Sequence, residues 1–264
     1  TGVHARNDQD TVARICSLLR GNPLGIILAA SWDGILSPEE ILSRLREGLG
    51  LDANVTGLPG RHQSLEAVFI FSWNTLSSSE KANLCALSVF RNNFSKMAAE
   101  KVCGVDIKGL VDLVSKSLVE KHEDGTFSIH SLIRDFAKEK TPLTIEKAEF
   151  RQLLRRHCGY FLGILYANSE NILEGNRSVA ADNLTGLLED ILAAWDFAVQ
   201  DKAYELIEKS SRPLRAYLGM RGLYEDGAIL FARSLEKLDE DSSTASRKVQ
   251  GGLLASMGWF SSFC

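Results

Sequence analysis

The stretch LVDLVSKSLVEKHEDGTFSIHSLIRDFAKEK, residues 110–140, decides the fold because the period of its apolar residues changes twice. Helical spacing gives way to alternation of apolar and polar residues in 118–122 and 127–129. Asp124-Gly125 lies between these two runs, and Asp-Gly is a favoured turn of a two-stranded hairpin. Helical spacing then returns. We therefore predict a β-hairpin between two helices.

Both flanking helices have a predicted inner face. In the first helix, the apolar residues at i, i+3, i+4, i+7 spacing are Ile107, Leu110, Val111 and Val114. In the second helix, residues 130–140, they are Leu132, Ile133, Phe136 and Ala137. Thr141-Pro142 is expected to end the second helix, because a residue before proline is disfavoured in the α region.

More helices are predicted before this stretch. An aromatic-rich helix starts near Ser64, and Ser77 and Ser95 are expected to be the N-caps of two others. A hairpin that follows three helices is typical of a winged-helix module. We place this module at residues 61–141.

Residues 1–60 are predicted to form a small helical domain of three helices. Gly21-Asn22-Pro23 separates the first two, and Ser37 is the expected N-cap of the third. The predicted inward residues are Val12, Ile15, Leu18, Leu19, Ile41, Leu42 and Leu45. Residues 50–63 are rich in Gly, Pro, Asn and Asp and mark the domain boundary.

Residues 142–264 are predicted to be helical throughout. The expected helices are 146–168, 182–199, 202–218, 224–238 and one from Ser246. Helix pairs of this size indicate an α-solenoid with tetratricopeptide-like repeats, although no strict 34-residue period fits. Trp195, Tyr204 and Tyr217 are expected in its core rather than in a ligand cage. The predicted fold class is mainly α: a helical bundle, a winged-helix module with one β-hairpin, and an α-solenoid.

Composition excludes several classes of protein. The 264 residues are 45% hydrophobic and 24% charged with a net charge of −4, which is ordinary for a globular chain and disfavours a dedicated nucleic-acid binder. Cys16, Cys85, Cys103, Cys158 and Cys264 form no C-x-x-C pair, so buried thiols are expected. Without a signal peptide or an apolar run of membrane-spanning length, we expect a cytoplasmic protein with no membrane partner. From both ends of the sequence we expect that it is a segment of a longer protein.

Motifs for catalysis are missing from the sequence. None of the 21 glycines precedes a lysine, so there is no P-loop of the form G-x-x-x-x-G-K-[ST]. No hydrolase elbow, zinc-protease helix or metal spacing among His4, His62, His122, His130 and His157 is present. We expect that the chain is no enzyme in itself and has neither catalytic residues nor a metal site.

Three signatures in order resemble one known module. They are RICSLLRGNPLGIILAAS (14–31), RHQSLEAVFIFSWNTLSSSEKANLCALSVFRNNFSKMAAEKVCG (61–104) and the stretch 110–140 quoted above. Together they look like the second half of the NB-ARC module of bacterial STAND signalling ATPases, many of which are transcriptional regulators with tetratricopeptide-like repeats. The resemblance covers residues 10–140 well and 141–264 loosely.

This resemblance implies three nucleotide-contacting residues. The G-x-P turn of the family sets its proline against adenine, which corresponds to Gly21 and Pro23. The histidine of the family's Met-His-Asp motif contacts the β-phosphate of ADP, which corresponds to His130. Ile129 and Ser131 replace the Met and the Asp. As alternatives, His130 only caps the following helix, and Gly21 and Pro23 only start theirs.

The resemblance also implies partners and a function. An upstream P-loop domain of an ATPase would hold ADP or ATP, and the isolated chain would hold no cofactor. The repeats would bind a protein or small-molecule inducer, and the parent protein would self-associate on activation. The alternative is a DNA-binding winged-helix regulator that uses residues 107–116. DNA binding is disfavoured, because Lys108 and Lys116 are offset by Asp106 and Asp112.

Overall fold

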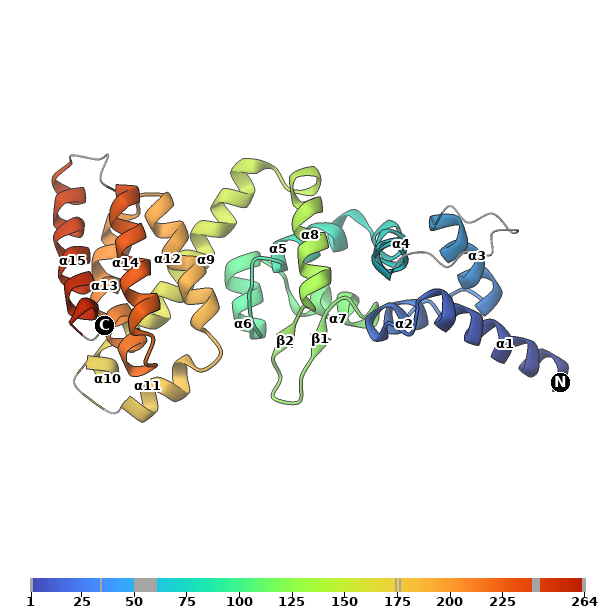
Figure 1. Cartoon of the computed structure of the whole chain (residues 1–264). Coiled ribbons are helices and arrows are strands. Elements are labelled where there is room, and N and C mark those ends of the chain that lie inside the picture. Colours follow the sequence, from blue (N-terminus) through green and yellow to red (C-terminus); the bar gives the residue numbers. More distant parts are fainter. Residues whose placement is uncertain are drawn as a thin grey trace. The chain divides into compact units, whose positions relative to one another are not determined.

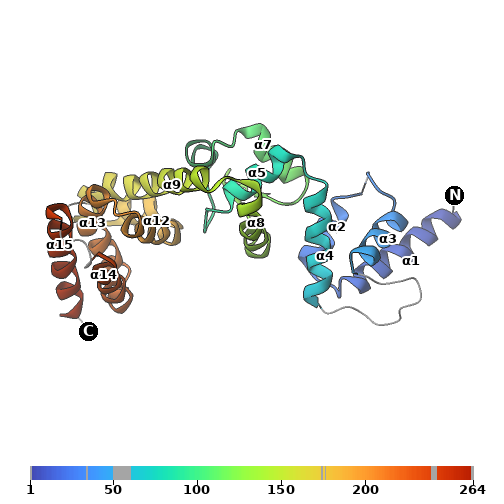
Figure 2. The same ribbon diagram turned by 90° about the horizontal axis from the view of Figure 1, so that it is seen from above.

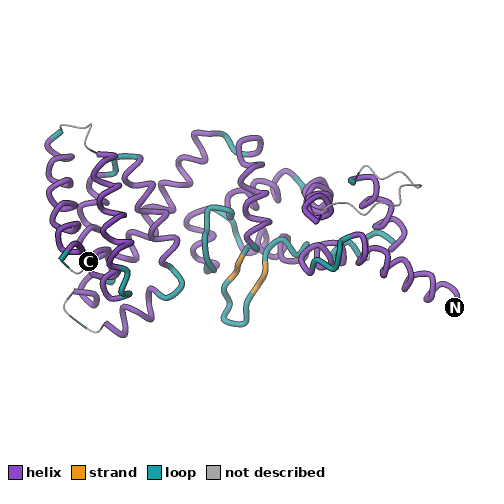
Figure 3. Tube along the Cα trace, in the orientation of Figure 1, coloured by secondary structure: helices purple, strands orange, loops and turns teal. Residues whose placement is uncertain are grey.

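The computed structural model describes residues 2–33, 35–49, 61–173, 175, 177–238 and 243–262. The chain is mostly helical and has one small antiparallel sheet (Figures 1 and 3), which confirms the mainly α class. Its contacts form two compact units. Unit 1 is Thr1–Ser88 with Val105–Glu146, and unit 2 is Val89–Gly104 with Lys147–Cys264. The predicted boundary at 50–63 lies mostly outside the described residues, as does Cys264.

The described part of unit 1 begins with four helices, and the N-cap of the third is the residue that the sequence predicts. They are α1 (Gly2–Leu18), α2 (Pro23–Ala30), α3 (Pro38–Gly48) and α4 (Arg61–Asn74). The Ser37 hydroxyl accepts a hydrogen bond from the Glu40 N–H, and the Glu40 carboxylate accepts one from the Ser37 N–H, so the predicted cap of α3 is confirmed. The predicted inner residues that are buried are Ile15, Leu18, Leu19, Ile41, Leu42 and Leu45.

Two details of α1 differ from the prediction. The helix begins well before Asp10, and Val12 is 47% exposed rather than buried. Its neighbour Thr11 is buried instead and donates a hydrogen bond to the Glu39 carboxylate at 3.2 Å. The inner face of α1 is therefore turned by one residue from the face that apolar spacing alone selects.

The predicted hairpin is confirmed. It lies between α7 (Ile107–Ser115) and α8 (Ser131–Thr144), and α5 (Ser78–Leu87) packs on both helices. Strands β1 (Glu120–Lys121) and β2 (Phe127–Ser128) pair antiparallel, with Glu120 opposite Ser128. Gly125 in the turn has φ of 81°, a conformation that glycine adopts without strain. The paired strands are shorter than the alternating runs of the sequence.

Helix α8 does not end at Pro142 as predicted, but continues to Thr144. Proline lacks the N–H that would complete one helical hydrogen bond. Two threonines support the turns around it, since Thr141 Oγ1 donates to Ala137 O and Thr144 Oγ1 donates to Lys140 O, both at 2.9 Å. Pro142 itself is exposed, so its ring has room outside the helix.

The predicted inner faces of α7 and α8 are partly wrong. Ile107 and Val111 are 45% and 55% exposed, and Leu132 is 43% exposed. In α7 the fully buried residues are Leu110 and Leu113. Gly109 lies beside them, where an added Cβ would be 2.6 Å from Asn83 Nδ2, so α7 packs tightly along this face. Apolar residues occupy two overlapping faces of α7, and the face that packs is the one that also carries Gly109.

In its described residues, unit 2 contains a short helical segment and seven further helices, the longer of which are labelled in Figure 2. The segment comprises α6 (Lys96–Ala98), which the predicted Ser95 cap starts, and a π-helical turn η1 (Ala99–Cys103). The others are α9 (Lys147–Ala167), α10 (Ser169–Leu173), α11 (Arg177–Leu184), α12 (Leu188–Gln200), α13 (Tyr204–Met220), α14 (Tyr224–Leu238) and α15 (Thr244–Ser261). Helix α9 packs on η1, α12 and α13, and α15 packs on α13 and α14.

One predicted helix of unit 2 is wrong. The segment 182–199 is not continuous, because α11 ends at Leu184 and α12 begins at Leu188. Gly186 between them has φ of 73°, outside the helical region. Trp195 and Tyr217 are fully buried, as predicted for core residues, and Tyr204 is half-buried.

A buried polar cluster ties residues 89–104 to two helices of unit 2. The Asp190 carboxylate on α12 accepts hydrogen bonds from the backbone N–H groups of Arg91 at 2.8 Å and Asn92 at 3.2 Å. His157 Nε2 on α9 lies 3.1 Å from the same carboxylate. Asp190 is 0% exposed and His157 is 2% exposed. Phe90 and Phe161 pack on the His157 ring, so the cluster is enclosed by aromatic side chains.

The described cysteines differ in their burial. Cys85 and Cys158 are buried, whereas Cys16 and Cys103 are partly exposed. Burial raises the pKa of the Cys158 thiol to about 12, which keeps it protonated at neutral pH. Among the described residues, none of the helices has the length and apolar character needed to cross a membrane.

Candidate functional site

The predicted adenine-contacting turn joins α1 to α2. Gly21 has φ of 65° and follows Arg20, whose φ of 53° is also positive. Asn22 is the N-cap of α2, because its Oδ1 accepts a hydrogen bond from the Gly25 N–H at 3.0 Å. Pro23 occupies the first turn, where its missing N–H costs nothing. Gly21 and Pro23 are both exposed, so the turn starts a helix and is also open to a ligand.

His130 lies directly after the hairpin and is the N-cap of α8. Its Nδ1 accepts a hydrogen bond from the Leu132 N–H at 3.3 Å, which confirms the capping role. The side chain is exposed. Because Nδ1 must be unprotonated to accept, the neutral ring that caps the helix carries its proton on Nε2. A donor atom therefore remains at the outer end of the ring.

The three predicted residues lie in unit 1, with Gly21 and Pro23 where α1 joins α2 and His130 at the start of α8. Within the described ranges, no hydrogen bond joins His130 to Gly21 or Pro23. Ser131, which stands where the resembling motif has an acid, is exposed at the start of α8. The histidine thus takes its orientation from the Leu132 N–H rather than from a neighbouring carboxylate.

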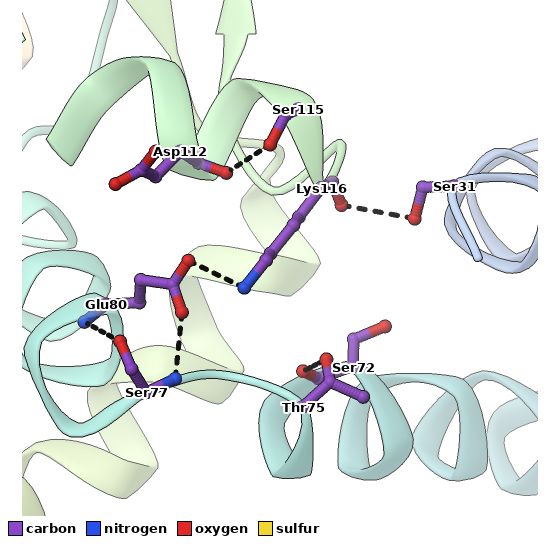
Figure 4. A network of polar contacts seen from close by, with 8 residues as sticks. All are labelled: Ser31, Ser72, Thr75, Ser77, Glu80, Asp112, Ser115 and Lys116. Atoms are coloured by element: carbon purple, nitrogen blue, oxygen red, sulfur yellow. Dashed lines mark hydrogen bonds and ion pairs between the residues drawn. The ribbon is translucent and has the colours of Figure 1, made fainter. Parts of the chain in front are cut away.

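A charged pair that the sequence did not reveal lies between α5 and α7 (Figure 4). Lys116 Nζ is 2.6 Å from Glu80 Oε1, and Glu80 Oε2 accepts a hydrogen bond from the Ser77 N–H at 2.8 Å. The Lys116 carbonyl also lies 3.4 Å from the hydroxyl of Ser31 at the end of α2. Lys116 therefore links three segments of unit 1. The predicted cap at Ser77 indicates Glu80, but nothing local indicates its distant partner Lys116.

Glu80 is held in its charged form. Burial acts to raise the pKa of its carboxyl, but hydrogen bonds from Lys116 and Ser77 outweigh burial and leave the pKa below its usual value. A polar groove of 380 Å³ lies beside the pair and is lined by Ser77, Ser79, Glu80, Asn83, Lys108, Gly109 and Asp112. In the part of the chain that the structure describes, no group of His, Cys, Asp and Glu is arranged to hold a metal ion.

The lowered pKa of Glu80 gives a pH-dependent prediction. At pH 7, Glu80→Gln should lower the free energy of unfolding by about 0.5–1.5 kcal/mol, because the pair is only partly buried. A depressed pKa stabilises the fold above the unfolded value of about 4.3, and this stabilisation is lost as pH falls through the lower folded value. The difference between variant and wild type in urea unfolding should therefore be smaller at pH 3 than at pH 7.

Glu139→Gln is the matched control, since Glu139 is an exposed carboxylate on α8 of the same unit. It should change the unfolding free energy by less than about 0.5 kcal/mol at either pH. A Glu80→Gln difference that stays constant between pH 7 and pH 3 would contradict the assigned role of the charge.

Comparison with known proteins finds similar proteins that match only part of the chain. No family model matches the chain, and no solved structure matches it. An uncharacterized protein of Mycobacterium bovis and two of Mycobacterium tuberculosis strains are each 32% identical over 160 residues. The matched region covers 56% of this chain and 40% of each relative. The chain therefore spans less than half the length of these relatives.

Proposed function

We propose that the chain is the regulatory and protein-interaction segment of a STAND-type nucleotide-switch protein. Residues 1–60 would be the helical domain of an NB-ARC module, 61–141 its winged helix, and 142–264 the start of tetratricopeptide-like repeats. An upstream P-loop domain would hold the nucleotide. The observation that best supports this proposal is His130, an exposed histidine directly after the hairpin with one ring nitrogen fixed by the backbone.

The two interpretations of His130 are compatible, because they use different atoms. Nδ1 caps α8, and the Nε2–H can donate a hydrogen bond to a phosphate oxygen of ADP. At the other end of the nucleotide, the exposed Pro23 ring offers an apolar face to adenine, and Gly21 keeps the approach free of a side chain. In this proposal His130 and Pro23 therefore add two contacts to a nucleotide that the upstream domain holds.

Regulation follows from differential binding. If His130 and Pro23 contact the nucleotide only in the closed arrangement, ADP stabilises that arrangement. An inducer on the repeats shifts the equilibrium only as far as it binds the open arrangement more tightly. In this proposal the residues that hydrolyse the nucleotide lie in the upstream domain, and the chain supplies the contacts that sense the nucleotide.

The test of the proposal separates capping from phosphate binding in a parent protein that carries the P-loop domain. His130→Ala removes both functions, whereas His130→Ser keeps a hydroxyl that caps helices well but cannot reach a phosphate in the same way. We expect ADP to dissociate about 10- to 100-fold faster from both variants, since a hydrogen bond to a charged group is lost. Only His130→Ala should also lower the stability of unit 1.

The outcomes are distinct. If ADP retention is unchanged in both variants, His130 is a cap and the proposed phosphate contact is absent. The chain of residues 1–264 alone is the second control, because it lacks a P-loop and should bind ADP no tighter than about 1 mM. Micromolar affinity measured by calorimetry would contradict an upstream nucleotide domain.

The DNA-binding alternative is less well supported by α7, its proposed recognition helix. Its exposed residues include Ile107 and Val111, which cannot hydrogen-bond to base edges. Its acidic Asp106 caps the helix through the Gly109 N–H at 2.8 Å, so a negative charge lies at the end that would meet phosphate. These features favour the nucleotide-switch proposal.

A further inference from the structure

A small apolar cavity opens in unit 1 where the end of α2 meets the C-terminal half of α4. Its volume is 270 Å³. Four of the side chains that line it are apolar: Trp32, Ile35, Leu36 and Phe71. The Trp32 and Phe71 rings touch at the wall, with centroids 4.3 Å apart and planes at 55°. Ile35 is 80% exposed and forms part of the rim.

One polar atom in this cavity has no partner. Ser72 is 4% exposed, and its hydroxyl makes no hydrogen bond to any described residue. This is unusual within the chain, because the hydroxyls of Ser211, Ser234 and Ser256 all donate to the carbonyl four residues earlier in their helices. In Figure 4 the Ser72 hydroxyl points away from α4, toward the space below Ser31 and Lys116.

A buried hydroxyl without a partner destabilises a fold, and Ser72 is one of the residues that line this cavity, so a molecule bound there would supply the missing partner. The site carries no unpaired charge, because the Lys116 ammonium is bound by Glu80 at 2.6 Å. A charged ligand would therefore gain little there. The aromatic and aliphatic walls select an apolar molecule, and the Ser72 hydroxyl selects one hydrogen-bonding group.

The volume limits the size of this molecule. A cavity of about 150 Å³ lined by apolar side chains accommodates benzene. The present cavity is nearly twice that size, which suits two fused rings but not a nucleoside with its polar ribose.

We propose that this cavity is a binding site for a small, neutral, bicyclic aromatic molecule with one hydrogen-bonding group, which pairs with the Ser72 hydroxyl. The site is separate from the turn at Gly21 and Pro23 and from His130. It therefore does not depend on the proposed nucleotide function, and nucleotide binding and occupation of the cavity can be tested independently.

The experiment uses indole and its isostere benzothiophene, which has the same shape but no N–H. Binding to the 264-residue chain is followed by the Ile35 methyl signals in NMR. We expect indole to shift these signals with a dissociation constant of roughly 0.1–1 mM, as its small number of atoms allows. Benzothiophene should bind about 3- to 10-fold more weakly, because it leaves Ser72 unpaired.

Two substitutions decide the assignment. Ser72→Ala should fold, since it removes only an unpaired hydroxyl, and it should abolish the preference for indole over benzothiophene. Ser72→Leu fills the cavity and should reduce the binding of both molecules at least 10-fold. The proposal is overturned if neither molecule shifts the Ile35 signals at about 2 mM, or if the preference for indole persists in Ser72→Ala.

Discussion

Replacing Asp190 by alanine should lower the free energy of unfolding of unit 2 by about 3–5 kcal/mol. The carboxylate is fully buried and accepts hydrogen bonds from Arg91 N and Asn92 N. Alanine removes the acceptor of these two N–H hydrogen bonds and the carboxylate beside His157 Nε2, and a buried group that loses its partner costs about 1–3 kcal/mol. Urea unfolding measures the change, and hydrogen exchange of residues 89–104 shows where the fold opens.

Asp190→Asn is the matched control. It keeps the size of the side chain and one carbonyl oxygen that can accept a backbone hydrogen bond, but it loses the charge. We expect about half the destabilisation of alanine, and the exchange of residues 89–104 should remain slow. If Asp190→Ala lies within about 1 kcal/mol of the wild type, the cluster does not hold this segment in place.

Replacing Trp195 by alanine should destabilise unit 2 by about 3–5 kcal/mol through a large cavity. Trp195 is 0% exposed, and its ring centroid lies 5.4 Å from that of Phe231. Its Nε1–H donates to the Ser234 hydroxyl at 2.9 Å. Alanine therefore removes aromatic packing and a buried hydrogen bond together. Thermal and urea unfolding should both show the loss.

Trp195→Phe separates the two contributions. Phenylalanine keeps most of the packing and removes the Nε1–H, while Ser234 still donates to Leu230 O at 2.7 Å. We expect a loss of about 1–2 kcal/mol. A destabilisation by phenylalanine as large as that by alanine would mean that the hydrogen bond, and not the volume of the ring, dominates at this position.

Local signals predicted much of the fold. The caps at Ser37, Ser77 and Ser95 and the turn at Asp124-Gly125 were found from the sequence, because each depends on side chains within three or four residues. The predictions of buried faces were wrong where residues distant in the sequence determine which face of a helix packs. Apolar spacing allows two inner faces of α7, and only the packing beside Gly109 selects Leu110 and Leu113.

The candidate site was less predictable than the fold. The capping role of His130 follows from its position before a helix, but the assignment of its Nδ1 to the Leu132 N–H required coordinates. Lys116, the partner of Glu80, is 36 residues away, and the backbone partners of Asp190 are 98 and 99 residues away. The sequence does not distinguish Ser72 from other helical serines, because the absence of a hydrogen-bond partner for its hydroxyl depends on the residues packed around it.

The division of the chain into units has a consequence for its synthesis. Residues 89–104 belong to unit 2, although both of their flanking segments belong to unit 1. They emerge from the ribosome about 100 residues before Asp190, an interval of roughly 5–20 s at ordinary rates of translation. Helix α9 follows this segment sooner, but the Asp190 carboxylate on α12 reaches Arg91 N and Asn92 N only after this interval. All of unit 1 is therefore synthesised before residues 89–104 can complete their contacts in unit 2, and chaperones that bind exposed apolar segments have their best opportunity during this interval.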